Sequence, residues 1–161
     1  MKAPENAARF REDVSRIASR YPDRHSAVLD ALRLAQARHG YLSREALEEV
    51  AEALDVTPAY CKAIASFYDM FHLAPIGRHL VEVCTNLSCA LAGAQRVVEA
   101  FESELGVRPG ETTDDGEVTL RTIECAGGCG RAPVVVVDHV YHEPADPEDV
   151  PRIVEELRGV S

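Results

Sequence analysis

The chain has 161 residues, 46% of them hydrophobic, which is enough for one ordinary core or a small core with a helical appendage. Its formal net charge of −10 argues against a nucleic-acid partner, because such binding depends on neutralising phosphate charge. The longest aliphatic run is the four valines at 134–137, and no apolar segment follows the charges of the N-terminus. We therefore expect neither a membrane span nor a signal peptide.

The first seventy residues show the periodicity of short helices. Apolar residues recur at helical spacing over 26–38, and Gly40 can supply the left-handed residue that ends this helix. A second apolar stripe follows Ser43 and runs to Leu54. The Thr-Pro pair at 57–58 is typical of a helix start and opens a third helix to about Tyr68. These patterns predict an N-terminal helical bundle, to which we give residues 1–77.

After Gly77 strands and helices alternate. The expected elements, in chain order, are a strand over 79–85, a helix ending at Leu105, a strand over 118–124, a hairpin over 133–141 and a closing helix around 150–157. The two strands of a β-α-β unit are parallel, with a right-handed crossover. The added hairpin and helix predict a compact thioredoxin-like α/β domain over 78–161.

Most of the negative charge lies in this second part. After Gly77 there are 7 basic and 16 acidic residues, against 10 and 11 before it. Such an acidic face can simply solubilise the domain, or it can form a docking surface or tune a site electrostatically.

Four of the five cysteines form two spaced pairs. Cys84 ends the first expected strand and Cys89 starts the helix after it, whereas Cys125 ends the second strand and Cys129 follows it. Because neighbouring parallel strands bring their carboxyl ends to one edge of a sheet, the four thiols can converge there. The helix N-terminus at Cys89 favours a thiolate, and the glycines at 127, 128 and 130 allow the backbone to approach a ligand closely.

Three kinds of site fit these cysteines. Structural zinc typically uses two short knuckles, C-x2-C to C-x4-C, and the spacing C-x4-C followed by C-x3-C fits it loosely. Iron-sulfur clusters bind through cysteines at varied spacings. Two disulfides would require an oxidising compartment, for which the sequence gives no signal. Spacing alone leaves the three alternatives open.

The remaining chemically active residues are interpreted as structural. Cys61 lies among apolar residues of a helix and is expected to be a small buried hydrophobe. None of the six histidines has ligand spacing, and the aromatic group of Phe67, Tyr68 and Phe71 is expected to serve packing. The sequence shows no G-x-G-x-x-G turn, no Walker loop, and no C-x-x-C pair of a disulfide oxidoreductase.

Four segments carry a resemblance to a known family: HGYLSREALEEVAEAL, SFYDMFHLAPIGRH, VCTNLSCALAGA and VRPGETTDDGEVTLRTIECAGGCGRAPVVVV. They closely resemble the thioredoxin-like 2Fe-2S subunit in the NADH dehydrogenase module of respiratory complex I, and the match runs from about Val28 to Leu157. Two departures are visible, Ala126 in place of the usual leucine and Ser66 in place of threonine.

The resemblance implies a helical domain followed by a 2Fe-2S ferredoxin domain, with Cys84, Cys89, Cys125 and Cys129 as the cluster ligands. It further implies an electron-transfer subunit without catalytic activity of its own, whose larger partner binds FMN and NADH. Its expected place is cytoplasmic and peripheral to the inner membrane. Two alternatives stay open: the diaphorase subunit of an NAD-dependent formate dehydrogenase or NAD-reducing hydrogenase, and, more distantly, a zinc-stabilised interaction module.

Overall fold

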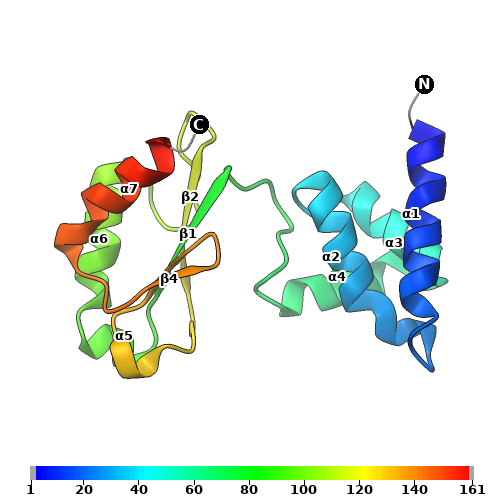
Figure 1. The fold of residues 1–161 in the computed structure, drawn as a ribbon, viewed down its shortest axis with the longest axis horizontal. Coiled ribbons are helices and arrows are strands. Elements are labelled where there is room, and N and C mark those ends of the chain that lie inside the picture. The colour runs from blue at the N-terminus through cyan, green and yellow to red at the C-terminus, as the bar shows by residue number, and fades with distance from the viewer. Residues whose placement is uncertain (1–2, 160–161) are drawn as a thin grey trace. The chain divides into compact units, whose positions relative to one another are not determined.

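The structure is a computed structural model that describes residues 3–159. The chain separates into two compact units, residues 1–75 and 76–161, and each unit has its own hydrophobic core. Figure 1 shows an all-helical first unit and a second unit built of strands and helices. Over the described residues, no helix combines the length and hydropathy that a bilayer crossing requires.

The described part of the first unit contains four α-helices and a short 3-10 helix, Arg24–Ala27. The α-helices are α1 (Ala3–Ala18), α2 (Val28–His39), α3 (Arg44–Leu54) and α4 (Pro58–Phe67). The last three agree with the sequence prediction, and their caps are those expected. The Ser43 hydroxyl accepts from the N–H of Ala46, and the Thr57 hydroxyl accepts from that of Tyr60. The helical character of this unit is thereby confirmed.

Helix α1 is absent from the sequence prediction. Its Phe10 and Val14 are fully buried and Ala18 nearly so, which places one residue per turn in the core of the first unit. The spacing of four residues is visible in the sequence. The many charged residues between these positions hide the apolar stripe.

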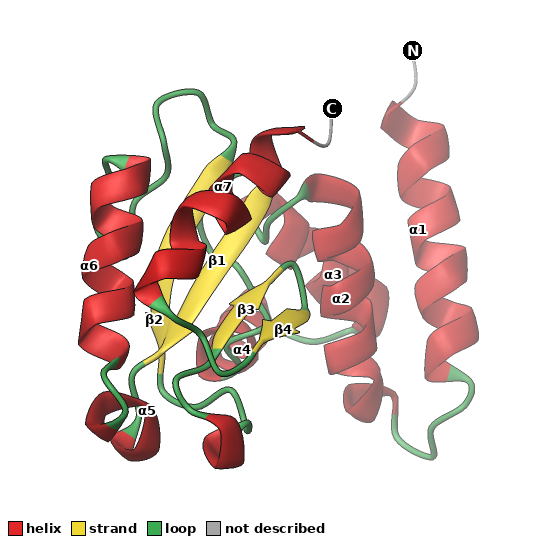
Figure 2. Cartoon of the chain, turned by 60° about the vertical axis from the view of Figure 1, so that its left-hand side comes forward, coloured by secondary structure: helices red, strands yellow, loops and turns green. Residues whose placement is uncertain are grey.

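The second unit contains a four-stranded sheet in the order β2-β1-β3-β4. Its strands are β1 (His79–Cys84), β2 (Val118–Ile123), β3 (Val135–Val137) and β4 (Val140–His142). Strands β1 and β2 are parallel, and β3 and β4 form an antiparallel hairpin, as predicted. The sequence did not predict that β3 pairs antiparallel with β1, which places the hairpin beside β1 (Figure 2).

The connection between β1 and β2 contains two helices instead of the single long helix that the sequence predicts. They are α5 (Leu87–Leu91) and α6 (Ala94–Leu105), and Gly93 separates them with a φ of 100°. This conformation is accessible to glycine at little cost and breaks the helix there. The closing helix is α7 (Val150–Gly159).

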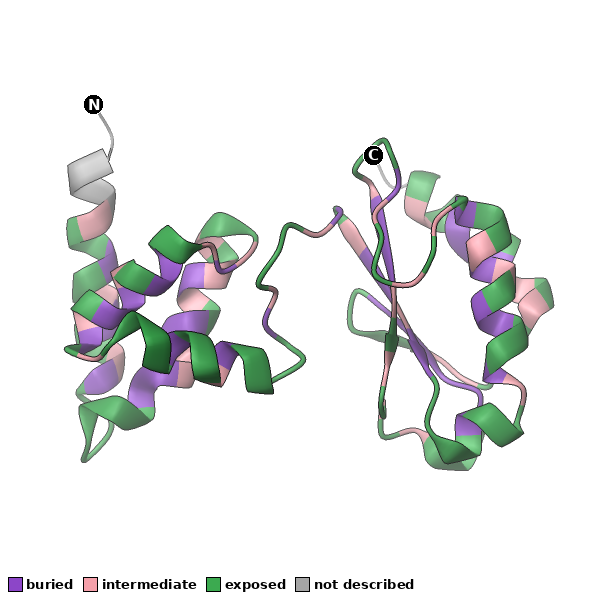
Figure 3. Ribbon diagram, turned by 180° about the vertical axis from the view of Figure 1, so that it is seen from behind, coloured by how far each residue is buried: buried purple, intermediate pink, exposed green. Residues whose placement is uncertain are grey.

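Helices α6 and α7 pack on the same face of the sheet (Figures 1 and 2). The core between these layers holds Val81 and Val83 of β1 together with Phe101 of α6 and Ile153 of α7. Figure 3 shows buried positions along the strands and along the inner sides of both helices. The packed core holds β1 and β2 in place, and their carboxyl ends carry the cysteines.

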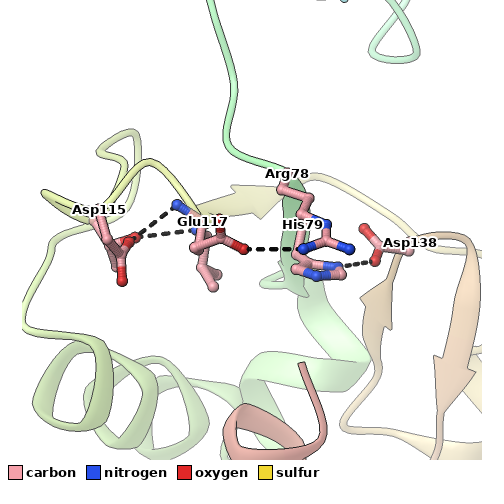
Figure 4. A network of polar contacts seen from close by, with 7 residues as sticks. Arg78, His79, Asp115, Glu117 and Asp138 are labelled. Carbon is pink, nitrogen blue, oxygen red and sulfur yellow. Dashed lines mark hydrogen bonds and ion pairs between the residues drawn. The ribbon is translucent and has the colours of Figure 1, made fainter. Parts of the chain in front are cut away.

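Polar contacts hold the sheet together at the opposite end, where β1 begins (Figure 4). His79 Nδ1 lies 2.6 Å from Asp138 Oδ2, and Asp138 Oδ1 accepts from the N–H of Leu80 at 2.9 Å. Arg78 forms an ion pair with Glu117 at 3.7 Å. His79 therefore lies five residues of extended strand, roughly 17 Å, from Cys84, in agreement with its interpretation as structural.

Candidate metal centre

The two cysteine pairs lie at one edge of the sheet, as predicted from their positions at the ends of two parallel strands. Cys84 is the last residue of β1 and pairs with Ile123, the last residue of β2. Cys125 follows two residues later, Cys89 lies in α5, and Cys129 begins a short 3-10 turn. The parallel pairing of β1 and β2 thus brings two distant sequence segments to the same place.

The pairs differ in exposure. Cys84 and Cys89 are each 1% exposed, whereas Cys125 and Cys129 are exposed, with their sulfur atoms 4.0 Å apart. All five cysteines are free thiols, which gives no support to the two-disulfide alternative. The site therefore has a buried side and a side open to solvent.

Hydrogen bonds favour the thiolate form of Cys84. Burial alone would raise its pKa, but the backbone N–H groups of Ala126 and Asn86 and the thiols of Cys89 and Cys125 lower it below the ordinary value. Thiolates are the form that binds metal, so a lowered pKa is what a ligand role at Cys84 would require.

The pKa values of two other thiols at this sheet edge are shifted in the opposite direction. Burial and the neighbouring Cys84 raise the pKa of Cys89, and the neighbouring Cys125 raises that of Cys129. The pKa values of Cys84, Cys89 and Cys129 therefore depend on neighbouring thiols, as expected for ionisable groups that share one small region. A positively charged metal centre would relieve this repulsion.

A glycine-rich loop carries the exposed pair. The backbone N–H of Gly127 donates to Cys125 Sγ at 3.4 Å, and Gly127 has a φ of 83°. The predicted role of the loop glycines, close approach of backbone N–H groups to sulfur, is confirmed at this position. The Tyr141 hydroxyl of β4 donates to the carbonyl of Ala126 at 2.7 Å and holds the loop from outside.

The far end of the same loop is held by Glu143. Arg131 donates to the Glu143 carbonyl at 2.8 Å. A Cβ atom at Gly128 would lie 2.6 Å from Glu143 Oε2 and 3.0 Å from Val134 Cγ2. Only glycine fits position 128 without movement of these neighbours, so the hairpin fixes the loop at both ends.

The four thiols can be compared with what a single zinc ion and a 2Fe-2S cluster each require. Tetrahedral zinc with Zn–S bonds of about 2.3 Å needs four sulfurs at mutual distances of roughly 3.8 Å. Among the described residues, no three His, Cys, Asp or Glu side chains converge closely enough to hold one metal ion. Two thiol pairs surrounded by N–H donors suit a 2Fe-2S cluster, in which each iron takes two cysteines and the sulfurs accept hydrogen bonds.

Sequence reasoning missed the residues that support the cysteines from outside. The Asn86 side chain caps α5 by accepting from the N–H of Leu87. Its own backbone N–H donates to the sulfur of Cys84 and lowers the pKa of that thiol. The cap is readable from an asparagine before the helix, but the contact of Tyr141 with Ala126 depends on the position of β4 beside the loop. Cys61 lies fully buried in α4 of the first unit, as expected.

The model of the Thioredoxin-like [2Fe-2S] ferredoxin family matches residues 14–158. The chain belongs to this family. This match confirms the thioredoxin-like fold and the kind of cluster that the resemblance implied, a 2Fe-2S centre.

Several relatives of the chain are named as subunits of an NADH-quinone oxidoreductase. The chain is 44% identical over 150 residues to an NADH-quinone oxidoreductase subunit of Rhizobium meliloti, covering 93% of this chain and 89% of that protein. It is 42% identical over 156 residues to an NADH-quinone oxidoreductase subunit of Mycobacterium tuberculosis, covering 97% of this chain and 62% of that protein.

A solved structure shares the fold. The structure of an NAD+-reducing [NiFe]-hydrogenase matches 80% of this chain with a TM-score of 0.69 and 22% sequence identity. Our chain covers only 22% of that hydrogenase chain. At this identity the match supports the fold of the ferredoxin family member and nothing more specific.

Proposed function

We propose that the chain is the electron-transfer subunit of an NADH-quinone oxidoreductase, respiratory complex I. It carries one 2Fe-2S cluster on Cys84, Cys89, Cys125 and Cys129, and exchanges one electron with the FMN of a larger partner that also binds NADH. It works as a peripheral part of the complex at the cytoplasmic side of the inner membrane. The observation that carries the proposal is the thiol network at the sheet edge, in a chain that is 44% identical to an NADH-quinone oxidoreductase subunit.

When bound, the cluster supplies one-electron chemistry, whereas NADH delivers a hydride and so requires a flavin between them. The sequence has no recognisable nucleotide motif, which supports a partner that holds FMN and NADH. The contribution of this chain is to bind the cluster and to set its reduction potential. Its buried thiols fix one side of the site, and N–H groups such as that of Gly127 stabilise negative charge on sulfur.

The test is an anaerobic preparation with iron and sulfide analysis, and electron paramagnetic resonance (EPR) before and after dithionite. We expect about two irons and two sulfides per chain and a spin-half signal only after reduction. A colourless protein with one zinc ion would contradict the proposed function and favour the interaction module.

The partner requires a second test. The chain is expressed with an affinity tag in its source organism and purified from the membranes. It should co-purify with an FMN-containing protein and quinone-reductase components. Recovery of formate dehydrogenase or hydrogenase subunits instead would assign the chain to one of those complexes and contradict the proposal of complex I.

A further inference from the structure

We propose that Tyr141 is a positioning residue that raises the reduction potential of the 2Fe-2S cluster held by the four cysteines. It acts through the peptide group between Ala126 and Gly127. The inference deepens the proposed function and rests on it, because it concerns the same site. It adds a residue that lies outside the four cysteines and comes from a different strand.

The geometry forms a chain of two hydrogen bonds across one peptide group. The Tyr141 hydroxyl donates to the Ala126 carbonyl at 2.7 Å, and the N–H of Gly127 donates to Cys125 Sγ at 3.4 Å. That carbonyl and that N–H belong to the same peptide unit. A hydrogen bond accepted by the carbonyl polarises the unit and makes its N–H a stronger donor, which is the cooperativity known for chains of hydrogen bonds.

The arrangement is fixed on both sides. Tyr141 pairs with Val136 across the β3–β4 hairpin, which holds the tyrosine beside the loop. On the loop, Gly127 has a φ of 83°, a conformation that residues with a side chain rarely adopt. The loop continues to Arg131, whose guanidinium donates a hydrogen bond to the carbonyl of Glu143, one residue beyond β4. The hairpin therefore controls the orientation of the peptide that faces Cys125.

The electrostatic consequence follows from the charge of the site. A 2Fe-2S centre with four thiolates is about −2 when oxidised and −3 when reduced, so each N–H directed at sulfur favours the reduced form and raises the potential. Cys125 is on the exposed side of the site, where water also competes, so the N–H of Gly127 acts together with solvent. Removing the Tyr141 hydroxyl should weaken this one donor without removing it.

The size of the effect follows from the cooperativity. The strengthened hydrogen bond is present in both redox states, and only its difference between them shifts the reduction equilibrium. A strengthening of 10–30% in one hydrogen bond to a charged sulfur then gives at most about a twofold change. For one electron, at 59 mV per tenfold, the limit is roughly 20 mV. Tyr141→Phe keeps the ring and removes the hydroxyl, and we expect it to lower the midpoint potential by up to this amount.

The experiment uses the full chain loaded with its cluster and compares midpoint potentials by EPR-monitored redox titration. Tyr21→Phe is the matched control, because its hydroxyl donates at 2.8 Å to Asp30 within the helical unit. Pulsed EPR of the reduced protein in H2O and D2O supplies a second readout. The exchangeable proton that couples to the spin should show a weaker coupling in Tyr141→Phe and an unchanged one in Tyr21→Phe.

A second variant keeps the test decisive if the phenylalanine protein loses its cluster. A fluorinated tyrosine at position 141 retains the ring and the hydroxyl but is a stronger donor, so it should raise the potential, measured at a pH where it stays protonated. An unchanged potential in the loaded Tyr141→Phe protein overturns the inference, as does the absence of a rise with the fluorinated residue. Failure of the proposed function looks different, because the unaltered chain would then bind no 2Fe-2S cluster at all.

Discussion

At the scale of single residues, the contrast between Cys61 and the other four cysteines separates packing from ligand chemistry. Cys61 is fully buried in α4, and burial raises its thiol pKa from 9.0 to about 11. The pKa of Cys84 moves the other way, because N–H donors and neighbouring thiols outweigh its burial. Two equally hidden cysteines are thus prepared for opposite roles by what surrounds the sulfur.

Replacing Cys61 by alanine should leave the iron content unchanged. The substitution removes one buried sulfur from the helical core, so we expect a loss of about 1 kcal/mol in the free energy of unfolding. Iron analysis and urea unfolding measure the two effects. Cys84→Ser is the positive control, because it should lose iron, and a loss of iron from Cys61→Ala would place this residue at the site after all.

The raised pKa of Cys61 also predicts a dependence of stability on pH. Unfolding returns the thiol to water, where it ionises near pH 9, whereas in the folded chain it holds its proton to about pH 11. The unfolded state therefore binds fewer protons in this window, and the contribution, complete below pH 9, is lost as the pH rises towards 11. Urea unfolding at several pH values should show a larger loss in the unaltered chain than in Cys61→Ala, and the difference is the contribution of Cys61.

Glu124 precedes Cys125 and is exposed, so its charge acts on the site mostly through solvent. A unit charge at about 8 Å in water contributes about 0.5 kcal/mol, or roughly 20 mV for one electron. Neutralising it in Glu124→Gln should therefore raise the midpoint potential by this order, and less at high salt. The control is Glu104→Gln, which removes the same charge farther from the cysteines. Glu104 lies ten residues, roughly 15 Å, beyond the start of α6. An equal rise in both variants would point to net charge, and an unchanged potential in Glu124→Gln would contradict the local effect.

At the scale of secondary-structure elements, Gly93 decides how the chain passes from α5 to α6. Its φ of 100° lies outside the range that other residues favour, so Gly93→Ala should cost about 1–2 kcal/mol of unfolding free energy. A Cβ there would also meet the Arg96 guanidinium at 2.8 Å, although that side chain can move. Gly159→Ala is the control, since a Cβ at this position meets nothing within 4 Å and α7 should gain slightly. Equal stabilities of the two variants would contradict the role of Gly93.

The elements also show what could be predicted from sequence. Periodicity and capping residues located α2, α3, α4 and both parallel strands, and the parallel pairing correctly placed Cys84 near Cys125. The break at Gly93 was hidden because the apolar stripe of α6 continues the pattern that begins in α5. The pairing of β3 with β1 depends on long-range packing, which local patterns do not encode. Tyr141 reaches Ala126 only because of that pairing, so its role could not be predicted.

At the scale of the whole molecule, the described residues form one hydrophobic cluster in the helical unit and two in the second unit, and no residue is shared between them. The smaller cluster of the second unit contains Cys84 and Cys89. The helical core is built from residues between Phe10 and Phe71, whereas the core beside the sheet uses residues between Val81 and Val154. The four cysteines and their hydrogen-bond donors all lie in the second unit. A unit that contains its own core and all four proposed ligands meets the requirements for folding alone and, on the proposed function, for binding the cluster.

We therefore expect the fragment of residues 76–161 to fold and to take up two irons per chain. Its midpoint potential and reduced EPR spectrum should agree with those of the full chain, because the fragment retains the N–H donors and neighbouring thiols of each cysteine ligand. Circular dichroism, iron analysis and redox titration of the purified fragment check this, with the same fragment carrying Cys129→Ser as the cluster-deficient control. A fragment that folds but has a shifted potential would show that the helical unit influences the site, and one that does not fold would show that the two cores depend on each other.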